Sequence, residues 1–256
     1  MSLTLEQVKS KSSARLLGLH PVILSATTVL IERCYARGIP ILITQGLRTN
    51  TEQDALYAQG RTKPGAIVTN AKGGYSYHNY GLAVDFALLL PNGSSVSWDM
   101  NRDYNDNNIK DWIEVVEEAK KLGFEWGGDW TSFKDYPHFQ MVFALTLTQL
   151  RAGIKPSETA LAKATAIIDR LKEEAKGDLS KIEELEAIVM KQDGRLRDVE
   201  KRLNISGKET YSINYTEAIT AAKAAGAITT SADKSKLELN IIQMFFNLGL
   251  FKKGDK

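Results

Sequence analysis

The sequence predicts an α+β domain, with a small antiparallel or mixed sheet and helices, followed by an α-helical C-terminal domain. In the first part, segments with helical spacing of apolar residues are interleaved with short β-branched runs. In the second part, apolar residues recur every seven positions. Gly and Pro between the two parts indicate a linker. We therefore expect a catalytic domain at residues 1–150, a linker at 151–157 and a helical domain at 158–256.

Three helices are expected in the first domain, at residues 21–35, 51–59 and 109–122. The first and third place apolar side chains on one helical face, and the second begins with a polar cap. Each segment is followed within three residues by a glycine, which commonly ends a helix.

Three strands are expected at residues 39–44, 81–90 and 138–143. The first reads Ile-Pro-Ile-Leu-Ile-Thr, with its proline near the start, where a strand tolerates it. The second is apolar at nearly every position, so we expect it to be covered on both faces. Residues 60–75 and 92–108 are rich in turn formers and predict loops. In this order of elements, helices come first and are followed by strands that alternate with loops. Such an order favours an antiparallel or mixed sheet with helices on one side.

The C-terminal part predicts helices only. Residues 161–203 show the heptad spacing of a coiled coil. The repeat has two polar interruptions, each with a glycine nearby: Asp178 with Gly177, and Gln192 with Gly194. Because glycine weakens a helix interior, we expect the helix to break there and fold back. Residues 213–250 predict two further helices with a turn at 226–231.

Composition and charge exclude several classes of protein. A net charge of +2 in 256 residues does not argue for a nucleic-acid partner or a membrane surface. The sequence has no run of 18 or more apolar residues, so membrane insertion is not expected. Its start has neither the basic residues nor the apolar stretch of a secretory signal, so we expect no signal peptide. The single cysteine, Cys34, cannot form an internal disulfide and is expected in the core.

Two of the three histidines lie in dense polar stretches of the first domain. One stretch, Ser-Tyr-His-Asn-Tyr-Gly-Leu-Ala-Val-Asp, contains His78 and Asp85, and the other, Asp-Tyr-Pro-His, contains Asp135 and His138. Two imidazoles and a carboxylate are a standard ligand set for catalytic zinc, which keeps one position for water. The metal lowers the pKa of that water to ~7. By itself this spacing is weak evidence for a metal site, because a lone buried histidine more often has a structural role in the core.

Four blocks of sequence carry a resemblance to a known family. They occur in order at residues 45–49 (Gln-Gly-Leu-Arg-Thr), 57–61 (Tyr-Ala-Gln-Gly-Arg), 76–85 and 126–139. In these blocks the chain resembles the zinc peptidases that include D-Ala-D-Ala carboxypeptidases and dipeptidases. Within them it is most similar to the L-alanyl-D-glutamate peptidases of bacteriophage endolysins and related autolysins. The resemblance covers about residues 5–145 and implies the fold of a zinc D-Ala-D-Ala peptidase.

The resemblance also implies roles for individual residues. His78, Asp85 and His138 match the ligands of one Zn²⁺. Asp135 matches the general base, a position that is glutamate in other branches of the family. Arg48 matches the arginine that holds the scissile carbonyl or the developing oxyanion.

Three more residues complete the expected site. Ser76 is expected beside the metal, where a hydrogen bond to a ligand would fix the orientation of that ligand. Gln59 and Arg61 are expected to line the substrate groove. His20, which has no motif around it, is expected to be structural.

The activity implied by the resemblance is hydrolysis of the L-Ala–D-Glu bond in the stem peptides of bacterial peptidoglycan. A D-Ala-D-Ala carboxypeptidase or dipeptidase, or a cellular autolysin, is the alternative, and a noncatalytic peptidoglycan-binding protein is a more distant one. We expect an endolysin that accumulates in the host cytoplasm and acts on the cell wall after release, with no nucleic-acid partner. For the C-terminal helices three hypotheses stay open: cell-wall binding, a homo-oligomer, or packing on the catalytic domain.

Overall fold

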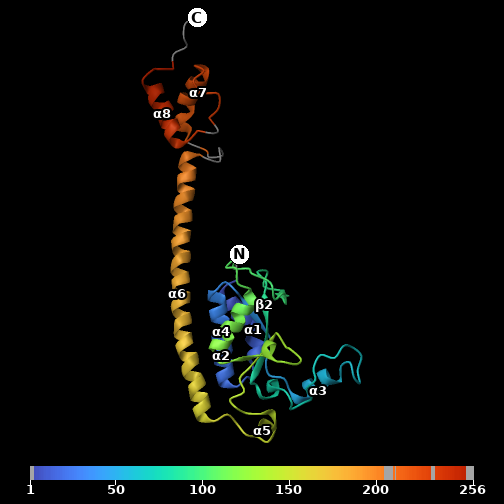
Figure 1. Cartoon of the computed structure of the whole chain (residues 1–256). Helices are drawn as coiled ribbons and strands as arrows, with labels where there is room; N and C mark the ends of the chain where they lie inside the picture. Colours follow the sequence, from blue (N-terminus) through green and yellow to red (C-terminus); the bar gives the residue numbers. More distant parts are fainter. Residues whose placement is uncertain (1–2, 205–209, 211, 232–233, 252–256) are drawn as a thin grey trace. The chain divides into compact units, whose positions relative to one another are not determined.

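The computed structural model describes residues 3–204, 210, 212–231 and 234–251 (Figure 1). The chain forms two compact units, Met1–Lys181 and Ile182–Lys256. Residues 1–2 of the predicted catalytic domain, and residues 205–209, 211, 232–233 and 252–256 of the predicted helical domain, lie outside the described residues.

The first unit contains a small antiparallel sheet, which confirms the predicted fold class. Its strands are β1 (Ile41–Gln45), β2 (Ala83–Leu89), β3 (Val96–Ser97), β4 (Glu125–Trp126) and β5 (His138–Gln140). They are ordered β1-β2-β5-β4, with β3 paired to β2, and every pair is antiparallel. The three predicted strands are present, the last one shorter than expected. The sequence did not predict β3 and β4, because two residues show no periodicity.

Helices accompany this sheet. They are α1 (Leu5–Leu16), α2 (Pro21–Ala36), α3 (Asn50–Ala58), α4 (Asp111–Lys121) and α5 (Leu147–Arg151), with the short 3-10 helices η1 (Tyr77–Tyr80) and η2 (Gly127–Asp129). The sequence missed α1, which buries few residues but begins with a capping box between Thr4 and Gln7. α1 and α2 pack against β1, and α4 packs against α2 (Figure 1).

Strand β2 separates the core from the face that bears the polar motifs. Successive side chains of a strand point to opposite faces. Val84 and Phe86 therefore point into the core, where the Phe86 ring stacks on Phe139 at 4.9 Å and lies 4.5 Å from Trp112 of α4. Asp85, between them, faces the other side. The same strand thus supports the core and presents a carboxylate.

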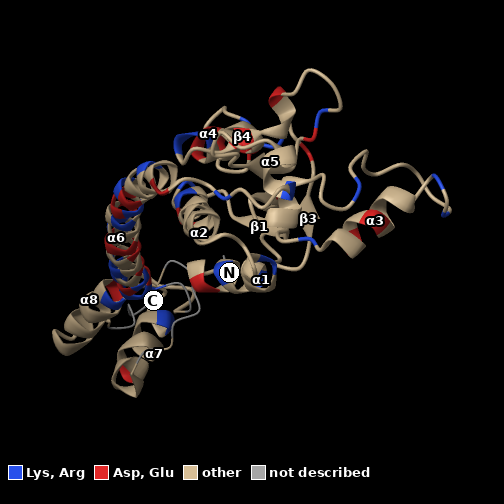
Figure 2. Ribbon diagram, turned by 90° about the horizontal axis from the view of Figure 1, so that it is seen from below, with Lys and Arg blue, Asp and Glu red and all other residues tan. Residues whose placement is uncertain are grey.

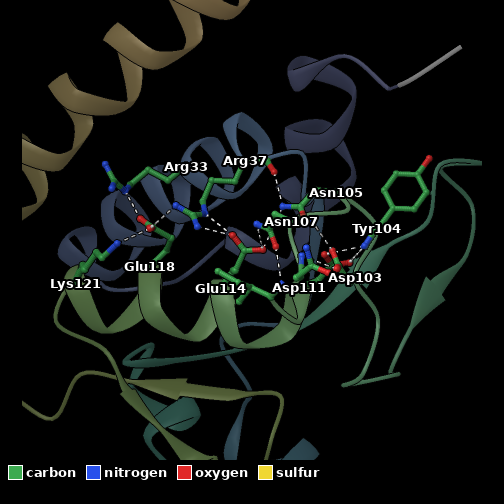
Figure 3. Close-up of polar contacts among 12 residues, drawn as sticks. Arg33, Arg37, Asp103, Tyr104, Asn105, Asn107, Asp111, Glu114, Glu118 and Lys121 are labelled. Carbon is green, nitrogen blue, oxygen red and sulfur yellow. Dashed lines mark hydrogen bonds and ion pairs between the residues drawn. The ribbon is translucent and has the colours of Figure 1, made fainter.

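Ion pairs between α2 and α4 hold the helical layer together (Figure 3). Arg33 Nε donates to Glu118 Oε2 at 2.6 Å, and Arg37 pairs with Glu114. Both glutamate side chains are almost fully buried. Burial alone would raise the pKa of Glu118, but its hydrogen bonds and ion pairs with Lys121 and Arg33 outweigh burial and lower the pKa. The loop that precedes α4 joins the same network (Figure 3).

The long helix α6 (Glu158–Leu203) is continuous, so the expected break was wrong. Gly177 and Gly194 lie on its exposed surface, and a Cβ at either position would meet no atom within 4 Å. Each glycine costs about 1 kcal/mol relative to alanine, a cost that the flanking helix formers offset. Three residues of α6 are buried: Ile168, Leu171 and Ala175. The boundary between the two compact units lies inside α6, after Lys181, and not at the predicted linker. The predicted division into domains at residues 151–157 therefore stays a prediction.

The second unit contains the end of α6, then η3 (Ile213–Tyr215), α7 (Thr216–Ala224) and α8 (Lys236–Asn247). Its small core joins α7 and α8 through Ala218, Ala222, Leu239 and Ile242. The two predicted helices are thus present. Among the described residues of the chain, no helix is both long and apolar enough to span a bilayer.

Candidate metal centre

Three predicted ligands from separate segments meet at one point. Asp85 of β2 and His138 of β5 are direct partners in the antiparallel ladder, and His78 comes from η1. Asp85 Oδ1 lies 3.2 Å from His78 Nε2 and 3.1 Å from His138 Nδ1, and the two nitrogens are 3.1 Å apart. Both histidines are buried, with 2% and 5% of their surface exposed. The structure therefore gathers one nitrogen from each ring and one carboxylate oxygen.

The outer nitrogen of each ring fixes its tautomer. His78 Nδ1 lies 2.8 Å from the carbonyl oxygen of Gly46, which can only accept, so Nδ1 carries the hydrogen. His138 Nε2 lies 3.0 Å from Gln140 Oε1, and the Gln140 amide nitrogen donates to Glu125 Oε2 at 3.1 Å. This second bond orients the amide so that its oxygen accepts from His138. When both rings are neutral, the inner nitrogens, Nε2 of His78 and Nδ1 of His138, therefore each carry a free lone pair.

This donor set fits a metal cation. The two inner nitrogens and the Asp85 oxygen each carry a lone pair and lie almost in contact. They repel one another unless a proton or a cation lies between them. Burial alone would raise the pKa of Asp85, but the charge and hydrogen bonds of His78 and His138 outweigh burial and lower the pKa. Burial would lower the pKa of His138, but its bond to Asp85 dominates and raises it. The group could hold a metal ion with three protein ligands.

The turn that carries His78 is closely determined by its sequence. Ser76 caps η1, and its Oγ accepts the backbone N–H of His78 at 3.4 Å. The Asn79 side chain accepts the backbone N–H of Ser76 and donates to the Arg48 carbonyl at 2.9 Å. The turn ends at Gly81, whose φ of 65° suits glycine. A Cβ at Gly81 would also lie 2.7 Å from a backbone oxygen of residue 18.

Arg48 lies beside the three ligands. Its backbone N–H donates to the carbonyl of His78, and its Nη2 lies 3.7 Å from Asp85 Oδ2. Its Nη1 donates to Gln53 Oε1 at 2.9 Å, and the Gln53 side chain is fully buried and donates to the carbonyl of Ala71. The Arg48 Nε is buried and has no hydrogen-bond partner among the described residues. The bond to Gln53 thus holds the guanidinium in place.

Asp135 enters the site on a tight turn. Its backbone N–H donates to the carbonyl of Gly127, and its carbonyl accepts the backbone N–H of His138 at 3.2 Å. A Cβ at Gly127 would lie 2.4 Å from the carbonyl oxygen of Asp135, so this turn needs glycine. Burial first, and the charge of Asp85 second, raise the pKa of Asp135. The turn therefore brings a second, half-buried carboxyl close to the three ligands.

These groups line one cavity of about 930 Å³. The predicted site residues on its wall are Arg48, Ser76, His78, Asp85, Asp135 and His138. Gln59 and Arg61 are also described but do not line it. Arg61 instead donates to the carbonyl oxygens of Tyr57 and Thr69, so it braces the loop beside the cavity. A substrate-binding role for Gln59 and Arg61 stays a prediction.

Sequence reasoning missed three supporting residues: Gly46, Gln53 and Gln140. Gly46 lies in the block Gln-Gly-Leu-Arg-Thr, but nothing in that block indicates that its carbonyl orients His78. Gln140 was open to prediction, because residues two apart on a strand share a face with each other. Gln53 gave no signal, since its polar side chain lies within a helix of mixed composition.

The chain is similar to proteins of known family. A family model described as D-alanyl-D-alanine carboxypeptidase matches residues 69–141. The chain is 57% identical over 124 residues to the peptidoglycan L-alanyl-D-glutamate endopeptidase CwlK of Bacillus subtilis (strain 168), covering 48% of this chain and 74% of CwlK. It is 37% identical over 116 residues to the L-alanyl-D-glutamate peptidase of Listeria phage A118, covering 45% of this chain and 35% of the phage protein.

A solved structure was also found, the L-Ala D-Glu endopeptidase ChiX of Serratia marcescens. The TM-score is 0.39 at 23% identity, over 53% of this chain and 89% of ChiX. The identity to CwlK over most of the length of that protein decides the assignment. This chain belongs to the D-alanyl-D-alanine carboxypeptidase family of peptidases, in the branch that contains CwlK.

Proposed function

We propose that this chain is a zinc-dependent endopeptidase that hydrolyses the L-Ala–D-Glu bond in the stem peptides of peptidoglycan. The observation that carries the proposal is the convergence of two imidazole nitrogens and one carboxylate oxygen in a cavity that also holds Arg48 and Asp135. The names of CwlK and of the phage relative support the choice of bond.

The residues divide the chemical work between them. His78, Asp85 and His138 would hold zinc, which supplies an activated water and polarises a carbonyl oxygen. Asp135 would accept a proton from the attacking water and deliver it to the leaving amine. Arg48, whose side chain lies on the wall of the cavity, would donate to the oxygen on which negative charge develops. Ser76 would keep the turn of His78 in place through its Oγ.

The test is digestion of purified peptidoglycan, followed by mapping of the new termini. New amino groups on D-Glu and new carboxyl groups on L-Ala are expected. Release of D-Ala without new D-Glu amines would refute the choice of bond and indicate a carboxypeptidase. Asp135→Asn should retain zinc and lose several orders of magnitude in kcat. An Asp135→Asn enzyme that turns over at the normal rate would remove Asp135 from the role of base.

We further propose that the chain acts as a phage endolysin on the host cell wall, which the phage relative supports. Expression of the chain in a bacterial cytoplasm should leave the cells intact until the membrane is permeabilised, and lysis should then follow. Cells that do not lyse after permeabilisation, although the purified protein digests their walls, would contradict this role. The helices beyond residue 157 are proposed to concentrate the enzyme on the wall.

A further inference from the structure

Helix α6 carries one apolar stripe whose two parts differ in exposure. The stripe follows alternating steps of three and four residues, the a and d positions of a heptad. Up to Lys181 its members Ile168, Leu171 and Ala175 are buried. Beyond Lys181 five members are exposed by 44–66%: Leu185, Val189, Leu196, Val199 and Leu203. A row of large apolar side chains in water favours association.

We propose that residues 182–203 form a parallel, in-register, two-stranded coiled coil with the same segment of a second copy of this chain. Ile182, Val189, Leu196 and Leu203 occupy the a positions, and Leu185, Gln192 and Val199 occupy the d positions. β-branched residues at a, with leucine at d, favour two strands in a parallel pair, and Ile182, Leu185 and Val189 follow that rule. The segment is roughly 33 Å long at 1.5 Å per residue, and it holds three heptads.

The charged residues that flank the stripe are arranged so that two parallel copies of this helix would attract each other. The e positions are all acidic (Glu186, Asp193 and Glu200), whereas the g positions Lys181, Arg195 and Arg202 are basic and the remaining one is Ile188. Figure 2 shows both signs of charge along α6. In a parallel dimer, each g residue faces the e residue five positions further along the partner helix, and such pairs set orientation.

These rules give attractive pairs in one orientation only. Lys181 would face Glu186 of the partner subunit, and Arg195 would face Glu200 of the partner subunit, each pair occurring twice by symmetry. In an antiparallel dimer g faces g and e faces e, so basic residues would oppose basic residues and acidic residues would oppose acidic ones. The charge pattern therefore favours the parallel arrangement over the antiparallel one.

Gln192 fixes the register. As a polar residue at a d position, it weakens the apolar contact unless it meets another hydrogen-bonding side chain. Only the in-register parallel arrangement places Gln192 opposite Gln192 of the partner subunit. A shift of one heptad would bury this amide against leucine or valine and leave it without a partner.

The dimer goes beyond the proposed peptidase activity and does not depend on it. Its function would be to link two catalytic units, so that one unit stays near the insoluble wall while the other dissociates. The activity on a small soluble peptide should not change with dimerisation, whereas the activity on intact walls should.

Sedimentation equilibrium of the full chain tests the stoichiometry. We expect a reversible shift with concentration from the monomer mass of 28.4 kDa to twice that mass. Val189→Glu should weaken dimerisation at least tenfold. Met190→Glu is the matched control: Met190 is the next residue and is 73% exposed, but it lies off the stripe, so this variant should dimerise normally. A wild-type chain that stays monomeric, a trimer mass, or equal effects of the two variants would overturn the proposal.

A charge exchange tests the orientation. Arg195→Glu would place acidic residues opposite Glu200 of the partner subunit, and Glu200→Arg would place basic residues opposite Arg195. Each single change should weaken the dimer, and the double variant should restore it. In an antiparallel dimer Arg195→Glu would instead relieve repulsion and strengthen association, which would refute the parallel arrangement. Circular dichroism of each variant controls for loss of helix.

Discussion

Replacement of Gln140 by leucine tests whether the hydrogen bond behind His138 prepares that ring for the metal. Gln140 is 7% exposed, and its Oε1 accepts from His138 Nε2 at 3.0 Å. Leucine removes the acceptor and leaves a buried N–H without a partner, at a cost of about 1–3 kcal/mol. The ring can then also move its proton to the inner nitrogen, where no metal can bind.

The expected result is a weaker affinity for zinc. Because about 1.4 kcal/mol corresponds to a factor of ten, the estimated cost weakens binding by roughly 5- to 150-fold. This range agrees with the ~10–100-fold loss typical when the outer hydrogen-bond partner of a metal ligand is removed. Competition with a chromogenic chelator at fixed pH measures the affinity directly.

A second buried glutamine provides the control. Gln53→Leu removes the bond to Arg48 but touches none of the three ligands, so it should lower kcat and leave zinc affinity within about twofold. If Gln140→Leu also binds zinc as tightly as the unmodified chain, the Gln140–His138 bond does not orient the ring, and the tautomer argument fails.

Three other changes address stability. Glu118→Gln should destabilise the fold by about 1.5–3 kcal/mol at neutral pH, because it breaks the buried pair with Arg33. Since folding lowers the pKa of Glu118, the difference in stability between the two chains should be complete above the ordinary pKa of 4.5 and vanish as pH falls through the lowered pKa. Urea unfolding at several pH values would measure it. Phe139→Ala should cost about 3–5 kcal/mol in the same assay, because the ring is fully buried; a loss below 1 kcal/mol would contradict its place in the core. Gly46→Ala places a Cβ 1.9 Å from the carbonyl oxygen of Arg15, so it should lower the thermal midpoint and weaken zinc binding together, and an unchanged midpoint would refute the steric argument.

Periodicity predicted the larger elements of the fold well. The helix at Pro21–Ala36 and the strand at Ala83–Leu89 were both visible, because long runs of apolar residues with a fixed spacing are the strongest signal in a sequence. The helix at Leu5–Leu16 was missed because its apolar face is weak, although its capping box was readable. Strands of two residues carry no pattern at all.

Glycine misled the prediction in the C-terminal helix. Gly177 and Gly194 suggested breaks, but each costs only about 1 kcal/mol and lies on an exposed face. Whether a glycine ends a helix depends on what the backbone could form instead, which the local sequence does not show.

The candidate ligands could be named from motifs, but their convergence could not. His78 and His138 are 60 positions apart, and only the pairing of β2 with β5 brings His138 opposite Asp85. The roles of Gly46 and Gln140 depend on distances between segments and therefore needed coordinates.

Asp85 lies on β2, which is hydrogen-bonded to β1 on one edge and to β5 on the other. The backbone that carries the Asp85 carboxylate is therefore held by strand pairing on both sides. The metal ion should therefore bind and dissociate while the chain stays folded. Amide hydrogens of this strand should exchange equally slowly before and after chelation, unlike those of small domains that order only around their metal.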